Sequence, residues 1–191
     1  MKLRVGVIYG GRSGEHEVSV VSAASIFKHL DRNRFQPVPI RIDKDGRWVL
    51  GAKEPTAISA GDVQESAPVG ALQVTEPTAA IGGGIDVIFP VLHGPYGEDG
   101  TVQGLLELAN VPYVGAGVLG SALGMDKAVS KRVFAAHGLP IVPYITVIAR
   151  EWETAPRDVT ARVASSLRYP VFVKPANLGS SVGISRAASD S

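Results

Sequence analysis

Residues 85–92 read IDVIFPVL and run directly into residues 93–100, HGPYGEDG. A near-continuous apolar run of this length is typical of a central strand in a parallel sheet, where helices cover both faces. The glycine-rich turn ends the strand, and the apolar spacing that follows predicts a helix over residues 101–109. This stretch therefore indicates an α/β protein.

The N-terminal residues repeat the pattern of strand, loop and helix. Residues 5–9 (VGVIY) predict a buried strand, residues 10–15 (GGRSGE) a loop, and residues 18–30 a helix. A strand at 35–42 follows, and the order strand–helix–strand predicts a parallel βαβ unit. Further short strands are predicted at residues 47–50, after the turn signal DKDG at 43–46, and at 111–114.

Residues 43–84 are expected to form an insertion in this first domain. Its later part, from residue 51, is rich in Ala, Gly, Pro and Thr and is weakly patterned. Short strands at 57–59 and 71–74 and a plain loop are equally compatible with this composition.

A change in charge supports a domain boundary near residues 120–125. Residues 1–124 hold 10 basic and 13 acidic side chains, whereas residues 125–191 hold 9 and 5. We predict a first domain over 1–122 and a second over 123–191, which contains helices at 126–137 and 157–167 and strands at 141–148, 171–175 and 182–186. The basic second segment suits a polyanionic small ligand such as a nucleotide, but it lacks the clustered basic stripe of a nucleic-acid reader.

Composition excludes several classes of protein. The 191 residues contain no cysteine, which excludes a disulfide scaffold, an iron–sulfur site and a cysteine-ligated zinc site. A membrane span needs about 20 apolar residues, and the longest mostly apolar stretch, residues 139–149, contains two prolines. The short run at 5–9 leads into Gly10, so it reads as a strand rather than a signal peptide. We expect a soluble, cytoplasmic protein.

Two candidate site residues belong to the first domain. Glu15 lies at the predicted start of a helix, where a carboxylate either stabilises the helix dipole or binds an ammonium group. His93 follows the central strand, so it is expected at the C-terminal edge of the sheet, where open α/β sheets bind ligands. We expect His16, His29 and His137 on helix surfaces, and no two histidines have zinc-ligand spacing.

The second domain carries a candidate phosphate site. Lys174 ends an apolar strand, where an unpaired buried charge is costly; the alternative is that it snorkels to solvent. The amides and hydroxyls of the loop Gly179-Ser180-Ser181 suit phosphate oxygens. Lys127 and Lys131, four residues apart, form a solvated helix face unless they reach this loop.

Together these segments closely resemble the D-alanine–D-alanine ligase family. The matching motifs are GGRSGEHEVS (10–19), HGPYGEDGTVQG (93–104), MDK (125–127) and VKPANLGSSVG (173–183), which agree with the family in order and spacing across essentially the whole chain. The resemblance implies a Rossmann-like pre-ATP-grasp domain with a parallel sheet, followed by the beginning of an ATP-grasp domain. It also implies a two-step reaction, in which ATP phosphorylates the carboxylate of one D-alanine and the amine of a second displaces the phosphate.

The resemblance assigns roles to individual residues. Glu15 would hold the ammonium group of the first D-alanine and would share a hydrogen-bond network with Ser180. His93 would lie beside the carboxylate of the same D-alanine. The ATP phosphates would be contacted by the lysines and the glycine-serine loop, namely Lys127, Lys174, Gly179, Ser180 and Ser181.

Members of the family continue beyond the position of Ser191, and the continuation carries their Mg²⁺ (or Mn²⁺) ligands. No metal ligand is therefore expected within this chain, and we predict that these 191 residues alone do not catalyse ligation. A D-alanine–D-lactate or D-alanine–D-serine ligase of the same fold is an alternative, because the second substrate is chosen mostly by the missing half. A non-catalytic nucleotide- or amino-acid-binding half-module is another. The resemblance also implies a homodimer, while the charge pattern and the apolar stretches predict no nucleic-acid and no membrane partner.

Overall fold

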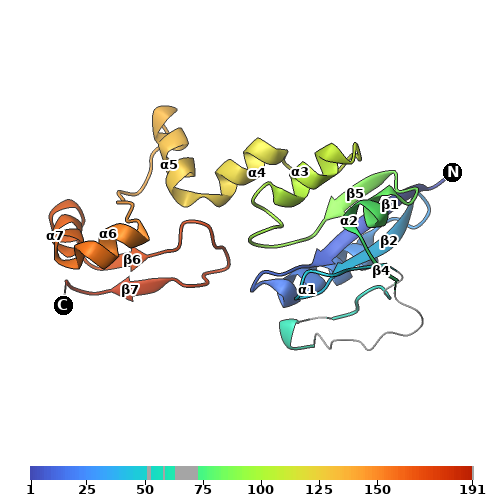
Figure 1. The fold of residues 1–191 in the computed structure, drawn as a ribbon, viewed down its shortest axis with the longest axis horizontal. Helices are drawn as coiled ribbons and strands as arrows, with labels where there is room; N and C mark the ends of the chain where they lie inside the picture. Colours follow the sequence, from blue (N-terminus) through green and yellow to red (C-terminus); the bar gives the residue numbers. More distant parts are fainter. Residues whose placement is uncertain (51–52, 58, 63–72, 191) are drawn as a thin grey trace. The chain divides into compact units, whose positions relative to one another are not determined.

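The computed structural model describes residues 1–50, 53–57, 59–62 and 73–190 (Figure 1). The chain divides into two compact units, Met1–Met125 and Asp126–Ser191. The division falls at the end of a helix, α4 (Val118–Met125), a few residues beyond the boundary predicted at 122.

The first unit is built on a five-stranded sheet in the order β4-β3-β2-β1-β5. Strand β1 (Leu3–Gly10) pairs in parallel with β2 (Phe35–Ile42) and with β5 (Val87–Pro90). The run expected as a central strand, β5, therefore lies at an edge of the sheet. A turn after β2 leads to the antiparallel strand β3 (Trp48–Leu50), and β4 (Gln73–Thr75) extends that edge. The predicted α/β fold and its parallel βαβ unit are confirmed.

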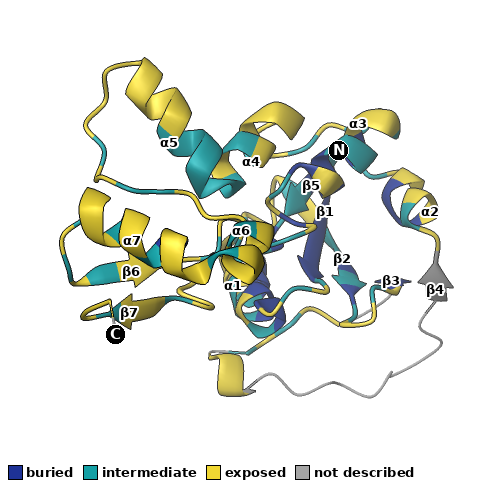
Figure 2. Cartoon of the chain, turned by 60° about the vertical axis from the view of Figure 1, so that its left-hand side comes forward, coloured by how far each residue is buried: buried dark blue, intermediate teal, exposed yellow. Residues whose placement is uncertain are grey.

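Helices cover both faces of this sheet, which explains the continuous apolar runs in the sequence. Alternate residues of a strand point to opposite faces. Val5, Val7 and Tyr9 of β1 pack against α1 (His16–His29), whereas Ile8 packs on the other face with α2 (Pro77–Gly82) and α3 (Thr101–Leu108). Figure 2 shows the resulting band of buried residues along β1.

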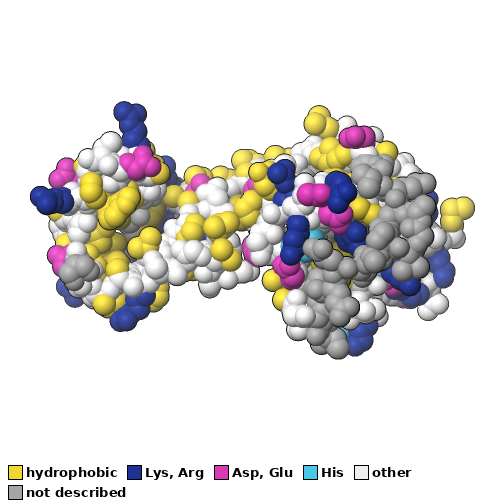
Figure 3. All heavy atoms as spheres, turned by 60° about the horizontal axis from the view of Figure 1, so that its bottom comes forward, with side chains coloured by type: hydrophobic (Ala, Val, Ile, Leu, Met, Phe, Trp, Pro, Cys, Tyr) yellow, Lys and Arg dark blue, Asp and Glu magenta, His cyan; other side chains and the backbone are white. Residues whose placement is uncertain are grey.

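The second unit contains three helices and one hairpin within the described residues. They are α5 (Lys127–Ala136), α6 (Ala149–Thr154), α7 (Pro156–Ser166), β6 (Val171–Val173) and β7 (Ser185–Ala187). The two strands are antiparallel, with Val171 opposite Ala187. Val159 is the one buried side chain among the described residues of this unit, and hydrophobic side chains are visible on its surface (Figure 3, left).

Some predicted elements differ from the structure. Residues 141–148 do not form a strand: Pro140 and Pro143 lack the N–H group that a ladder needs, and no described strand pairs with the segment. The strand predicted at 111–114 is reduced to a single parallel bridge between Tyr113 and Ile88. In the strand predicted at 57–59, residues 57 and 59 are irregular, and residue 58 lies outside the described part.

Four elements were not predicted, and one strand is displaced. The helices α2, α4 and α6 and the short 3₁₀ helix η1 (Ala60–Asp62) have no counterpart in the sequence prediction. The final strand begins at Ser185 rather than at residue 182.

Candidate functional site

A buried serine joins the ends of two neighbouring parallel strands. Ser19 of α1 is fully buried; its Oγ accepts a hydrogen bond from the amide of Gly10 at 2.8 Å and donates one to the carbonyl of Val91 at 2.6 Å. Gly10 has a φ of +91°, and a Cβ there would lie 2.3 Å from the carbonyl oxygen of Ile42. Only glycine permits this close turn, which brings the loop after β1 beside the end of β5.

The two predicted substrate residues of the first domain lie close together at this edge. Ser13 links them: its Oγ donates to the carbonyl of His93 at 2.6 Å and accepts from the amide of Glu15 at 3.2 Å. Glu15 is 5% exposed. Its Oε2 lies so close to Gly94 that a Cβ at that position would be 2.5 Å away. The structure thus brings a buried carboxylate next to the His93-Gly94 turn.

Carboxylates stabilise the turn that follows His93. The amide of Gly94 donates to Glu98 Oε2 at 2.7 Å, and the amides of Tyr96 and Thr101 donate to the two Asp99 oxygens at 2.9 and 3.0 Å. Burial alone would raise the pKa of Asp99, but these backbone hydrogen bonds outweigh it and lower the pKa. The turn therefore carries two carboxylates whose oxygens bond to its own backbone.

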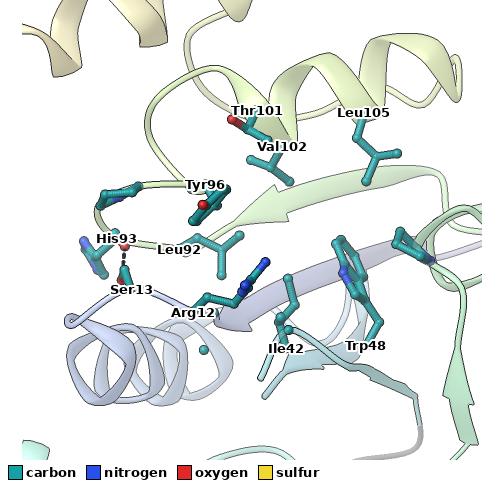
Figure 4. Close-up of a pocket in the computed structure, with 16 residues that line it drawn as sticks. Arg12, Ser13, Ile42, Trp48, Leu92, His93, Tyr96, Thr101, Val102 and Leu105 are labelled. Carbon is teal, nitrogen blue, oxygen red and sulfur yellow. Dashed lines mark hydrogen bonds between the residues drawn. The ribbon is translucent and has the colours of Figure 1, made fainter. Parts of the chain in front are cut away.

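A cavity of about 350 Å³ opens beside this edge, between the loop after β1 and the start of α3 (Figure 4). Its walls are mostly apolar and include Trp48 and Leu92. At one side the Arg12 guanidinium lies 5.4 Å from the centre of the Tyr96 ring, a cation–π contact. His93 is among the residues that border both this cavity and a second one of about 710 Å³.

In the second unit, Lys127 is hydrogen-bonded to residues just before the glycine-serine loop. Its Nζ donates to the carbonyls of Ala176, at 3.3 Å, and Leu178, and its amide donates to the same Ala176 carbonyl at 3.1 Å. Asp126 caps the helix by accepting from the amides of Ala128 and Val129, both at 2.9 Å. Lys127 is therefore bonded to the segment that leads directly into Gly179.

The loop itself has an unusual backbone. Ser180 and Ser181 have φ values of +47° and +61°, in the left-handed region that non-glycine residues rarely adopt. Both are exposed, as is Lys174, which precedes the loop at the end of β6. A strained backbone of this kind persists only where the surrounding structure holds it in place, and it is common at ligand-binding sites. Glu15 and Ser180 belong to different units, and the hydrogen-bond network expected between them remains a prediction.

The sequence prediction was wrong about one histidine and missed several serines. His16 was expected on a helix surface, but it is 7% exposed and its Nδ1 lies 2.7 Å from the carbonyl of Gly11. Because a carbonyl only accepts, Nδ1 carries the proton. Ser13, Ser19 and Ser22 were not singled out. Helical spacing could have indicated the last two, since they lie three residues apart on one face.

Within the described ranges, no three His, Cys, Asp or Glu side chains come together as a metal site requires. The same part of the chain holds no helix that is both long and apolar enough to span a bilayer.

Two family models match the chain, one in each unit. The model described as D-ala D-ala ligase N-terminus matches residues 4–116, and the one described as D-ala D-ala ligase C-terminus matches residues 133–191.

Curated relatives and solved structures with similar sequences carry related names. A D-alanine--D-alanine ligase of Heliobacterium modesticaldum is 50% identical over 98% of this chain and 53% of its own length. The structure of the D-alanine-D-alanine ligase from Coxiella burnetii matches 99% of this chain and 57% of its own, with a TM-score of 0.77 and 35% identity. A D-Ala:D-Ser ligase from Enterococcus faecalis matches 97% of this chain and 55% of its own, with a TM-score of 0.72 and 32% identity. The chain thus spans about half the length of the curated relatives it matches.

Proposed function

The chain belongs to the D-alanine–D-alanine ligase family, and on that premise we propose that the protein joins two D-alanine molecules in an ATP-dependent reaction. A carboxylate oxygen of the first D-alanine attacks the γ-phosphorus of ATP, which gives D-alanyl phosphate and ADP. The amine of the second D-alanine then attacks the acyl carbon, the C–O bond to phosphate breaks, and the amine loses a proton. Phosphorylation is needed because an amine does not displace a carboxylate oxygen directly.

One observation carries the proposal for the first unit: the buried Glu15 carboxylate and His93 lie together at the C-terminal edge of β1 and β5. A D-alanine zwitterion has an ammonium group and a carboxylate a few ångströms apart. Glu15 would bind the ammonium group, since a carboxylate in a site of low dielectric attracts a cation strongly. His93 would donate a hydrogen bond to the substrate carboxylate.

The second unit would bind the phosphates of ATP. Lys127 and Lys174 would supply positive charge, and the amides and hydroxyls of residues 179–181 would supply donors. The contacts of Lys127 with the Ala176 and Leu178 carbonyls support this assignment, because they bring an ammonium group to the loop. The roles proposed for the residues of this chain concern D-alanine and the phosphates.

The glycine-serine loop would act as a lid over the reaction. With phosphates bound, its donors would close on them, and water that would hydrolyse the acylphosphate would be excluded. Ser180 would also extend toward the hydrogen-bond network of Glu15. A homodimer and a cytoplasmic location, where ATP and D-alanine are both available, complete the proposal.

The test is an enzyme assay of the full-length gene product. Each reaction contains ATP and Mg²⁺. The amino-acid substrate is D-alanine alone, L-alanine alone, D-alanine with D-serine, or D-alanine with D-lactate. Phosphate release and the mass of the product are measured. We expect D-alanyl-D-alanine and one phosphate per dipeptide, with no turnover of L-alanine. A main product containing serine or lactate would support the alternative ligases, and nucleotide binding without turnover would support a binding module.

Variants assign the roles in the same assay. Glu15→Gln keeps the size of the side chain but removes its charge, and is expected to raise KM for D-alanine more than KM for ATP. Lys174→Met is expected to do the opposite. A ligase in which both variants behave like the wild type would retain the family assignment but lose these residue roles.

A further inference from the structure

Ser22 of α1 contacts the imidazole of His93. Its Oγ lies 3.0 Å from His93 Nε2, across a separation of 71 residues in the chain. Ser22 lies on the same helix face as Glu15 and Ser19, because these positions are seven and three residues before it. One face of α1 thus meets the strand β5 and its following turn at two points, through Ser19 at Val91 and through Ser22 at His93.

The backbone and the ring of His93 are held by different side chains. Ser13 bonds to the carbonyl of His93, which fixes the peptide but leaves rotation about the side-chain bonds free. The next residue, Gly94, has no side chain that could restrict the ring. Among the described residues, Ser22 is the side chain that hydrogen-bonds a ring nitrogen of His93.

The direction of this hydrogen bond determines which ring nitrogen carries the proton. In a neutral imidazole one nitrogen donates and the other accepts, and a partner on one fixes the role of the other. Were Nε2 to donate to Ser22, Nδ1 would be a bare lone pair, which repels a carboxylate. Were the Ser22 hydroxyl to donate to Nε2, Nδ1 would carry the proton and could bond a carboxylate.

We propose that Ser22 is a positioning residue: its hydroxyl donates to His93 Nε2, keeps the proton on Nδ1, and directs Nδ1–H toward the carboxylate of the first D-alanine. This inference rests on the proposed function. It deepens that function by naming the residue that sets the tautomer and orientation of His93. The hydroxyl of a serine within a helix often bonds to the carbonyl four residues earlier. The proposal explains why the Ser22 hydroxyl contacts His93 instead.

The tautomer is tested by NMR of the gene-encoded protein labelled with ¹⁵N-histidine. His93→Gln identifies the His93 signals among the four histidines. We expect a protonated Nδ1 and an unprotonated Nε2 in the wild type, a shift toward a mixture of tautomers in Ser22→Ala, and restoration in Ser22→Thr, which keeps the hydroxyl. Ser25→Ala is the matched control, because Ser25 is exposed on the same helix and contacts His29. A protonated Nε2 in the wild type, or a spectrum unchanged by Ser22→Ala, would overturn the proposal.

Kinetics provide the second readout. Ser22→Ala is expected to raise the apparent KM for D-alanine roughly three- to tenfold, the effect of one neutral hydrogen bond, with little change in KM for ATP. Ser22→Thr should recover most of the loss. If His93→Gln itself leaves KM for D-alanine unchanged, the proposed role of His93 fails, while the NMR spectra still decide whether Ser22 sets its tautomer. An effect of His93→Gln without any effect of Ser22→Ala would refute the positioning role alone.

Discussion

Replacing Gly94 by alanine perturbs the contact between the turn that follows His93 and the Glu15 carboxylate. The new Cβ would lie 2.5 Å from Glu15 Oε2 and 3.3 Å from Ser13 Cβ. Non-bonded heavy atoms need about 3.5 Å, so the carboxylate must retreat by roughly 1 Å. A misplacement of that size can cost about 100-fold in rate. We therefore expect kcat/KM for D-alanine to fall about 10- to 100-fold in Gly94→Ala.

The same substitution has a separate effect on stability. At a φ of +75° an alanine is strained by about 1–2 kcal/mol, partly offset by about 0.4–1 kcal/mol because alanine restricts the unfolded chain. Urea unfolding should show a small net loss. Gly14→Ala is the matched stability control: no atom lies within 4 Å of its added Cβ and its φ is not positive. Activity within twofold of the wild type in a folded Gly94→Ala protein would refute the reasoning.

Three further predictions concern other parts of the chain. Ser19→Ala leaves two backbone groups at the sheet edge without a partner and should lower the free energy of unfolding by roughly 2–4 kcal/mol in urea titrations, whereas Ser25→Ala should change it by less than about 0.5 kcal/mol. Burial raises the pKa of Tyr9 to about 12, so the phenol ionises first in the unfolded chain and stability should fall between about pH 10 and 12; Tyr9→Phe should abolish this fall in unfolding measured at pH 9 and 11. Lys127→Met removes the ammonium group from the glycine-serine loop and should raise KM for ATP about tenfold, while the exposed Arg132→Ala should leave it unchanged.

The parallel core could be predicted from the sequence because its signal is local. Residues 5–9 and 85–92 are short apolar runs ended by glycine-containing turns, and strands buried on both faces produce that pattern directly. Residues 141–148 show where the same reasoning fails. They are apolar and β-branched, yet a strand exists only if a neighbour accepts its hydrogen bonds, and composition does not reveal whether one is present.

The candidate site could be predicted only in part, for a related reason. Glu15 and His93 were recognisable because each follows a strand at the end where α/β sheets bind ligands. The residues that hold them were not recognisable, because Ser13 and Ser22 act over long separations in the chain, through contacts that no local pattern encodes. His16 was misplaced because a helix start was assumed to be exposed, whereas the Gly11 carbonyl requires a buried donor there.

The most direct test of the central claim is product analysis by mass spectrometry after the gene-encoded protein is incubated with ATP, Mg²⁺ and D-alanine. We expect D-alanyl-D-alanine and phosphate in equal amounts, with the yield sharply reduced in Glu15→Gln. ATP turnover that does not depend on D-alanine, or the absence of any dipeptide from folded, nucleotide-binding protein, would contradict it.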